Sequence, residues 1–256
     1  MSKDKVKPKK YLGQHFLKDE NIARKIAELP LNCGYNGPLL EIGPGMGVLT
    51  KYILPNHSLT LCEIDSESVV YLKKHYPQVP IIEGDFLRLN IHDYYQEPFG
   101  VIGNFPYNIS SQIIFKILDD KEMVPFACGM FQREMAKRIA SPHGSKEYGI
   151  ISVLTQTYFD VTYHFTVDEG VFQPPPKVKS GVISLKRIAK PDILDEKLFK
   201  NIVKTAFNQR RKTMRNSLRG LVADVEFLKD EIFNKRPEEI SVSQFHQLSN
   251  QIFNLR

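Results

Sequence analysis

The sequence is short of cysteine and has no long apolar run. Its three cysteines, Cys33, Cys62 and Cys128, are odd in number, far apart and mostly in apolar surroundings. This pattern predicts reduced thiols in the core of a cytoplasmic protein rather than a framework of disulfides. No apolar stretch approaches the roughly 18 residues that span a bilayer, and the lysines near the start precede no apolar segment of a signal peptide. We therefore expect neither a membrane span nor a secretory signal.

Histidines at metal-ligand spacing are also missing. None of the seven histidines lies at that spacing from another histidine or a cysteine, so we expect no metal site. The sequence has 29 Asp and Glu residues against 35 Lys and Arg residues. The resulting net charge of +6 favours a polyanionic partner. Five lysines and one aspartate fall within residues 1–10, which we expect to form a mobile basic arm, either solvated or in contact with nucleic acid.

The first half of the chain does contain the pattern of a nucleoside-binding βαβ unit. An expected strand at 39–42 leads into a loop whose glycines, Gly43 and Gly45 among them, let a ligand approach the backbone at the start of a helix expected over about 48–54. A second strand ends at Glu63, whose carboxylate can accept both hydroxyl groups of a ribose. Because position 48 is valine, the loop departs from the dinucleotide fingerprint and favours S-adenosylmethionine over NAD.

Two further strand ends carry groups suited to adenine. A strand expected at 79–82 precedes Asp85 and Phe86, and the Asp85 carboxylate can either accept an N–H of an adenine amine or cap the next turn. Another apolar run, 99–102, precedes a corner made of Asn104, Phe105, Pro106 and Tyr107. Pro106 stops the strand. The Asn104 amide oxygen and the Phe105 carbonyl can then accept both N–H bonds of an exocyclic amine while Tyr107 stacks on the base.

The order of these strand ends is more specific than any one of them. Gly43, Glu63, Asp85 and Asn104 follow successive strands at intervals of about twenty residues. In an open α/β sheet the carboxyl ends of parallel strands line a common ligand crevice. A turn residue or a helix cap is the simpler interpretation of each in isolation. Together they predict a single cleft at one edge of the sheet.

A proline-rich stretch and a basic cluster complete the candidate sites. Three prolines at 174–176 hold Phe172 and Lys177 on a stiff, extended path, so Phe172 is either the second wall of a base pocket, opposite Tyr107, or a core residue. Further along, basic side chains without an intervening acid suit phosphate contacts, although a solvated helix face is the alternative. This cluster comprises Arg210, Arg211, Lys212, Arg215 and Arg219.

The length of 256 residues favours one large domain with a smaller appendage. Glycines become rare after residue 187, helical patterns dominate, and Lys190-Pro191 interrupts the chain. We expect a domain over 1–188 that binds the nucleoside and a small helical domain over 189–256 that docks on RNA.

With these residues in view, the chain resembles the small-subunit ribosomal RNA adenine dimethyltransferases of the kasugamycin-sensitivity type. The matching stretches, which cover nearly the whole length, lie at 11–17, 41–47, 103–110, 172–178 and 207–213. The resemblance implies a class I (Rossmann-like) methyltransferase sheet of seven strands with helices on both faces, followed by a small all-α C-terminal domain. It also implies S-adenosylmethionine-dependent methylation of the N6 amines of two adjacent adenosines near the 3′ end of 16S rRNA, during small-subunit biogenesis, by a cytoplasmic monomer.

The resemblance carries residue roles with it. Catalysis is expected from Asn104, Phe105, Pro106, Tyr107 and Phe172, with the two aromatic rings enclosing the base and no strong general base required. The cofactor is expected to contact His15, Leu17, Gly43, Gly45, Glu63, Asp85, Phe86 and Asn104. Position 15 departs from the asparagine expected there. RNA contacts are expected from Lys177, Arg210, Arg211, Lys212 and Arg215.

Three alternatives remain at this point. The erythromycin-resistance dimethyltransferases, which act on 23S rRNA, look similar in the first domain, although the triple-proline loop and the 207–212 stretch resemble the 16S group. A non-catalytic ribosome-assembly factor can share the fold. A DNA adenine methyltransferase shares the chemistry of the 104–107 corner.

Overall fold

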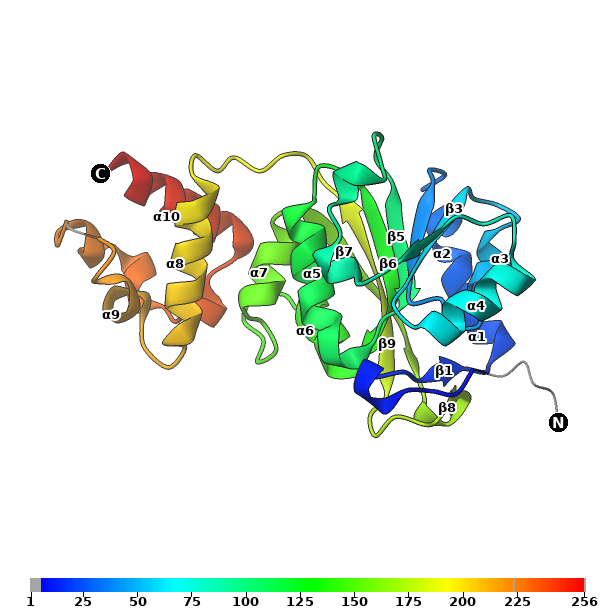
Figure 1. Cartoon of the computed structure of the whole chain (residues 1–256). Coiled ribbons are helices and arrows are strands. Elements are labelled where there is room, and N and C mark those ends of the chain that lie inside the picture. Colours follow the sequence, from blue (N-terminus) through cyan, green and yellow to red (C-terminus); the bar gives the residue numbers. More distant parts are fainter. Residues whose placement is uncertain (1–5, 223, 256) are drawn as a thin grey trace. The chain divides into compact units, whose positions relative to one another are not determined.

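The structure, a computed structural model, describes residues 6–222 and 224–255. Within them a seven-stranded sheet has the strand order β4-β3-β2-β5-β6-β9-β7 (Figure 1). Strands β2 to β6 pair parallel, and β9 pairs antiparallel with β6. The strands are β2 (Leu39–Ile42), β3 (Leu59–Glu63), β4 (Ile81–Glu83), β5 (Gly100–Asn104), β6 (Phe126–Gln132), β7 (Phe159–Val167) and β9 (Ser180–Arg187). The expected seven-stranded α/β sheet is confirmed.

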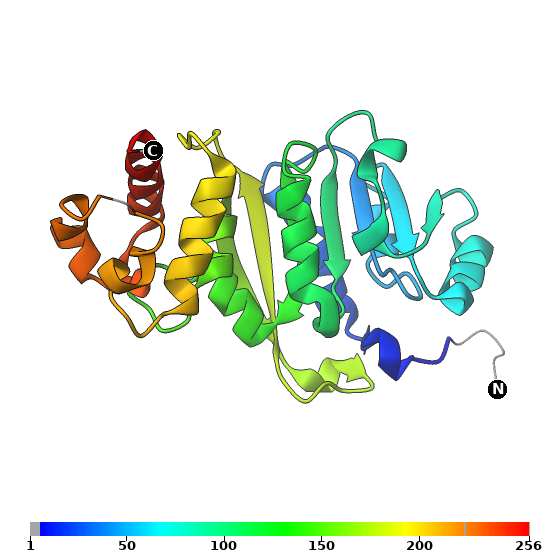
Figure 2. The ribbon, with the colours of Figure 1, turned by 60° about the vertical axis from the view of Figure 1, so that its left-hand side comes forward.

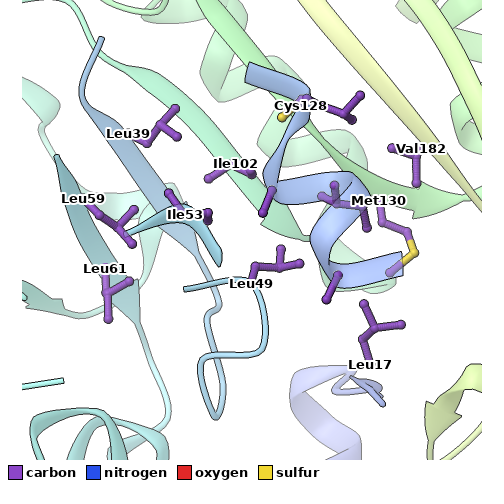
Figure 3. Packing of buried hydrophobic residues seen from close by; sticks show 14 of the residues in the cluster. Leu17, Leu39, Leu49, Ile53, Leu59, Leu61, Ile102, Cys128, Met130 and Val182 are labelled. Carbon is purple, nitrogen blue, oxygen red and sulfur yellow. The ribbon is translucent and has the colours of Figure 1, made fainter. Parts of the chain in front are cut away.

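Helices cover the sheet and bury its apolar strands. All four residues of β2 are buried, as is typical of a parallel strand with helices on both faces. One cluster joins side chains of α1 (Glu20–Ala27), α2 (Leu29–Asn32) and α3 (Thr50–Ile53) to the strands, including Leu39 and Ile102 (Figure 3). Figure 2 shows α5 (Ser110–Asp119) in front of the central strands. None of the helices in the described part of the chain is long and apolar enough to cross a membrane.

Local signals set most of the element ends. The Asp19 carboxylate accepts the backbone N–H groups of Asn21 and Ile22 and caps α1. The helix expected over 48–54 is shorter, because tight turns occupy residues 45–49 and α3 begins at Thr50. Helix α4 (Ser66–His75) follows β3, and helix α6 (Arg133–Ala140) follows β6.

The N-terminal segment is fixed against a distant part of the chain. Strand β1 (Phe16–Leu17) pairs antiparallel with β8 (Phe172–Gln173), the start of the proline-rich stretch. Residues 1–5 of the expected mobile arm lie outside the described residues. Val6 is buried and the Lys9 ammonium pairs with the Asp65 carboxylate, so the arm is held in place from residue 6 onward.

Compact packing divides the chain into two units, residues 1–136 with 160–187, and residues 137–159 with 188–256. The division falls close to the expected boundary at 188, but the second unit also includes 137–159. The Tyr148 ring contacts Phe207 edge to face, and the Gly144 N–H donates to the Glu238 carbonyl, which explains the grouping. The helices of the second unit are α7 (Ile150–Gln156), α8 (Glu196–Asn208), α9 (Met214–Leu218) and α10 (Val242–Asn254).

Candidate active site

The ends of four neighbouring strands, β4, β3, β2 and β5, meet at one edge of the sheet. A pocket of about 150 Å³ opens there and is lined by Gly43, Glu63 and Asp85, three of the four strand-end residues predicted to share one cleft, and by Phe86. Its remaining lining residues are Tyr11, Leu12, Gln14, Ile42, Cys62, Ile64, Gly84, Leu87, Pro106, Asn108 and Ile109. This candidate site is therefore built from strand ends and from residues of the N-terminal segment.

The glycine loop has the backbone that its sequence requires. Gly43, Gly45 and Gly47 have φ angles of 65°, 57° and 77°, in the left-handed region that side chains disfavour. A Cβ on Gly45 would lie 2.8 Å from the Phe16 ring. The loop is thus pressed against the N-terminal segment, and only glycine fits at that contact.

Glu63 holds this loop in place. Its carboxylate accepts the Gly45 N–H at 3.0 Å through one oxygen and the N–H groups of Ile64 and Asp65 at 2.9 Å through the other. The side chain is buried, and burial raises the pKa of Glu63. A carboxylate has about four acceptor positions, and three are used here. Accepting both ribose hydroxyls therefore requires that one of these backbone bonds be exchanged.

Asp85 takes the capping position that was its simpler interpretation, and it also lines the pocket. Its carboxylate accepts the Leu87 N–H at 3.0 Å and caps the short 3₁₀ helix Phe86–Arg88. Phe86 is buried against the pocket wall. The cap leaves Asp85 at the rim of the pocket, so the two interpretations are compatible.

Asn104 lies in a second, smaller cavity. This cavity, about 30 Å³, has room for about one water molecule and is lined by Gly13, Gln14, His15, Phe16, Asn104, Phe105, Pro106 and Tyr107. Gln14 and Pro106 also line the larger pocket, so the two spaces adjoin. The Asn104 Nδ2 donates to the His15 carbonyl at 2.9 Å. This bond orients the amide and keeps Oδ1 as an acceptor.

Tyr107 and His15 close this cavity together. Their rings lie 5.5 Å apart and are tilted by 31°. The Tyr107 hydroxyl hydrogen-bonds to the Ser180 hydroxyl, and burial raises the pKa of Tyr107. The His15 Nδ1 lies 2.8 Å from the Pro174 carbonyl oxygen, which can only accept, so Nδ1 carries the proton. Position 15 thus connects the 104–107 corner to the proline-rich stretch.

Phe172 and Leu17 lie elsewhere than their expected roles suggest. Phe172 is 1% exposed and Leu17 is 4% exposed, and both belong to the buried core cluster. They face each other across the β1–β8 pair. The structure thus places Phe172 in the core, the alternative interpretation, rather than opposite Tyr107, because pairing with β1 turns its ring inward.

The basic residues divide into two groups. Lys177 lines a cavity of about 260 Å³ with Arg133 and Lys179, and the acidic residues Glu134 and Glu169 also line it. In the second unit Arg211 and Lys212 are exposed after the end of α8.

Arg210 turns inward in the second unit. Its guanidinium donates to the Lys146 carbonyl at 2.8 Å and lies 3.7 Å from the Glu238 carboxylate. No acidic residue lies within the basic cluster along the sequence, but the fold brings Glu238 next to Arg210. Arg210 therefore has a structural role in the second unit.

The sequence did not show that residues of the N-terminal segment line the larger pocket. Tyr11, Leu12 and Gln14 line it, together with Asn108 beyond the proline corner. One signal was present: Gly13 has a φ of 65°, and a Cβ there would lie 2.5 Å from the Asn108 side chain. The glycine between Leu12 and Gln14 marked a close approach that no local pattern could assign.

Known proteins are similar in sequence to this chain over nearly its whole length. A family model described as ribosomal RNA adenine dimethylase matches residues 5–254. The chain belongs to this family. Relatives called ribosomal RNA small subunit methyltransferase A, from Bacteroides thetaiotaomicron and Flavobacterium johnsoniae, are 52% and 54% identical to it. The alignments cover 96% and 97% of this chain and 94% and 97% of the relatives.

Solved structures agree on the fold of the family. A dimethyladenosine transferase from Plasmodium falciparum superposes with a TM-score of 0.81 at 24% identity, covering 94% of this chain and 98% of that one. The 23S rRNA methyltransferase ErmE superposes with a TM-score of 0.69 at 26% identity, covering 93% and 99%. The fold class expected from the sequence, a class I methyltransferase sheet with a helical C-terminal part, is confirmed.

Proposed function

We propose that the protein transfers methyl groups from S-adenosylmethionine to the N6 amines of two adjacent adenosines near the 3′ end of 16S rRNA, in the small ribosomal subunit. One observation carries this proposal: a pocket built from strand ends adjoins a cavity that holds an oriented amide, Asn104, and the aromatic ring of Tyr107. The relatives that are 52% and 54% identical to this chain are called ribosomal RNA small subunit methyltransferase A. Their name favours 16S rRNA over 23S rRNA as the substrate.

The larger pocket fits the methyl donor. The glycine loop offers backbone unobstructed by side chains, Asp85 at the rim is an acceptor for an adenine amine, and Phe86 gives an apolar wall. When bound, S-adenosylmethionine supplies an electrophilic methyl group on a positively charged sulfur. Glu63 and Asp85 both line the pocket, and their acidic side chains suit a cationic ligand.

The smaller cavity fits the acceptor amine. An adenine N6 is a weak nucleophile because its lone pair is delocalised into the ring. Acceptance of its two N–H bonds by Asn104 Oδ1 and the Phe105 carbonyl favours a pyramidal nitrogen, and these bonds strengthen as positive charge develops on that nitrogen. The methylated nitrogen then releases its proton to water, and the methyl bond that forms at nitrogen replaces the one that breaks at sulfur.

A base needs more room than this cavity offers. The Tyr107 ring lines the cavity, and it is held by the His15 ring and by the Ser180 hydroxyl. We infer that an extruded adenine displaces the Tyr107 ring from this position and then stacks on it, a contact worth about 1–3 kcal/mol. Since Phe172 is buried, the opposite face of the base contacts other groups in this conformation.

The test is the Asn104→Ala variant with unmethylated small subunits. We expect transfer of a radioactive methyl group to fall by at least about 10²-fold, since the acceptor of the transition-state hydrogen bond is gone, while subunit binding stays near the wild-type value. Asn56→Ala, at an exposed position that lines neither cavity, is the matched amide control. Retained transfer in Asn104→Ala would contradict the assignment.

Parallel assays separate the other candidate functions. The wild-type protein should methylate assembled small subunits in preference to free 23S rRNA and DNA. Subunit binding without any transfer would identify an assembly factor instead, and transfer to DNA alone would identify a DNA methyltransferase.

A further inference from the structure

The second unit contains a pocket that the methyl-transfer site does not use. It measures about 400 Å³ and lies between α9 and the segment that follows it. Its lining residues are Arg215, Asn216, Arg219, Val222, Val225, Leu228 and Lys229. Every charged side chain that lines it is basic, and the remainder are apolar except for one amide. Such a lining matches a ligand with a negative charge and a flat apolar face.

Arg215 is fixed at one side of this pocket. Its Nε donates to the Leu228 carbonyl at 2.9 Å, which orders the guanidinium and leaves its terminal N–H groups as further donors. Lys229 shares its charge with Glu226, 2.7 Å away. Arg219 is exposed at the rim. Arg219 and Arg215 are therefore the cations best placed for an anionic ligand.

The apolar wall of the pocket is open to solvent at one position. Val222 and Leu228 are 6% and 5% exposed, whereas Val225 is 68% exposed. An aliphatic side chain next to arginines gives a surface on which a nucleobase can lie flat, with a guanidinium near its phosphate. The Asn216 amide offers both a donor and an acceptor to a base edge. An acidic peptide would use the cations but leave this wall exposed.

We propose that this pocket binds one unstacked nucleotide of the ribosomal RNA, with the base against Val225 and Leu228 and the phosphate on Arg219 and Arg215. The inference rests on the proposed function, because it assigns to the RNA substrate a second contact outside the site of methyl transfer. The ligand is a single-stranded nucleotide rather than a duplex, because only an unstacked base can lay its face against Val225 and Leu228.

The phosphate contact is tested by Arg219→Gln, with Lys204→Gln on exposed α8 as the matched control. Methyl transfer to small subunits is measured at several salt concentrations. We expect Arg219→Gln to raise KM several-fold, leave kcat unchanged, and lower the slope of log KM against log salt by about one, because one phosphate contact is lost. A KM and a slope equal to those of Lys204→Gln would overturn the phosphate assignment.

The base contact is tested by Val225→Asp, with Val225→Leu as the conservative control. Chemical probing of the subunit RNA should show one unpaired nucleotide that the wild type and Val225→Leu protect and Val225→Asp leaves reactive, while other protections persist. The KM should rise several-fold, because a carboxylate replaces the apolar surface on which the base lies and repels the nearby phosphate. Unchanged protection and KM in Val225→Asp, with an unfolding midpoint like that of the wild type, would overturn the pocket.

These outcomes are separable from failure of the proposed function. If the wild type transfers no methyl group to small subunits, the proposed function fails. If it does transfer methyl groups and both pocket variants match their controls, only the nucleotide pocket fails. Competition of an acidic peptide for the site, without any RNA protection, would also reject the nucleotide in favour of a protein partner.

Discussion

Glu41 shows how a single side chain sets a property of this fold. It lies in β2 with 1% of its surface exposed, and the Thr50 hydroxyl donates to its carboxyl group at 2.6 Å. Burial raises the pKa of Glu41 to about 8, with a further contribution from the Glu63 carboxylate. The folded protein thus favours the neutral acid at a pH where an exposed glutamate is ionised.

We expect Glu41→Gln to remove a pH dependence of stability. An unfolded Glu41 loses its proton near pH 4.5, whereas the folded protein keeps it up to about pH 8. The stabilisation is therefore complete below pH 4.5 and decreases as the pH rises through this window, by about 1.4 kcal/mol per pH unit. Urea unfolding at pH 5 to 8 should show a wild-type advantage over the variant that shrinks with rising pH. A constant difference would contradict the burial of the neutral acid.

The glycine loop and the N-terminal segment act at the scale of elements. Gly45 has a φ of 57° and touches the Phe16 ring, whereas Gly34 has a φ of 78° with no atom within 4 Å of its added Cβ. Gly34→Ala should cost only the strain of the left-handed backbone, about 1–2 kcal/mol. Gly45→Ala should cost at least about 1 kcal/mol more, because Phe16 must move. Thermal unfolding of the pair, with cofactor titration, checks this, and equal costs would refute the contact.

The N-terminal segment is tied to the rim of the larger pocket through Lys9. Its ammonium pairs with Asp65, and its backbone N–H donates to the Gln14 side chain at 2.8 Å. We expect Lys9→Gln to weaken S-adenosylmethionine binding, at most about fivefold, because the ion pair is partly exposed. Lys10→Gln, one position away, is the control. Calorimetric titration measures both affinities, and equal values would show that the pair does not support the pocket.

The whole molecule shows which features a sequence can predict. Strand ends at Gly43, Glu63, Asp85 and Asn104 were predictable, because apolar runs and glycine turns are local and their meeting follows from the parallel sheet. The inward position of Phe172 was not, since it depends on pairing with a strand far along the chain.

Contacts between distant residues also decide which arginines are paired and which segments belong to each unit, and the sequence could not show these contacts. Arg210 meets Glu238 only once the second unit has folded, so the sequence could not show that this arginine is engaged. Residues 137–159 join that unit for a similar reason, since the Tyr148 contact with Phe207 brings together positions that no local pattern connects.

The pairing of the N-terminal segment with the proline-rich stretch has a consequence for the synthesis of this protein. His15 and Pro174, which hydrogen-bond to each other, are 159 positions apart. A nascent chain can fix His15, which lines the smaller cavity beside Asn104, only after the proline-rich stretch has left the exit tunnel. The enzyme therefore becomes competent late in its own translation, and a ribosome that is still making it is not exposed to a half-built but active copy.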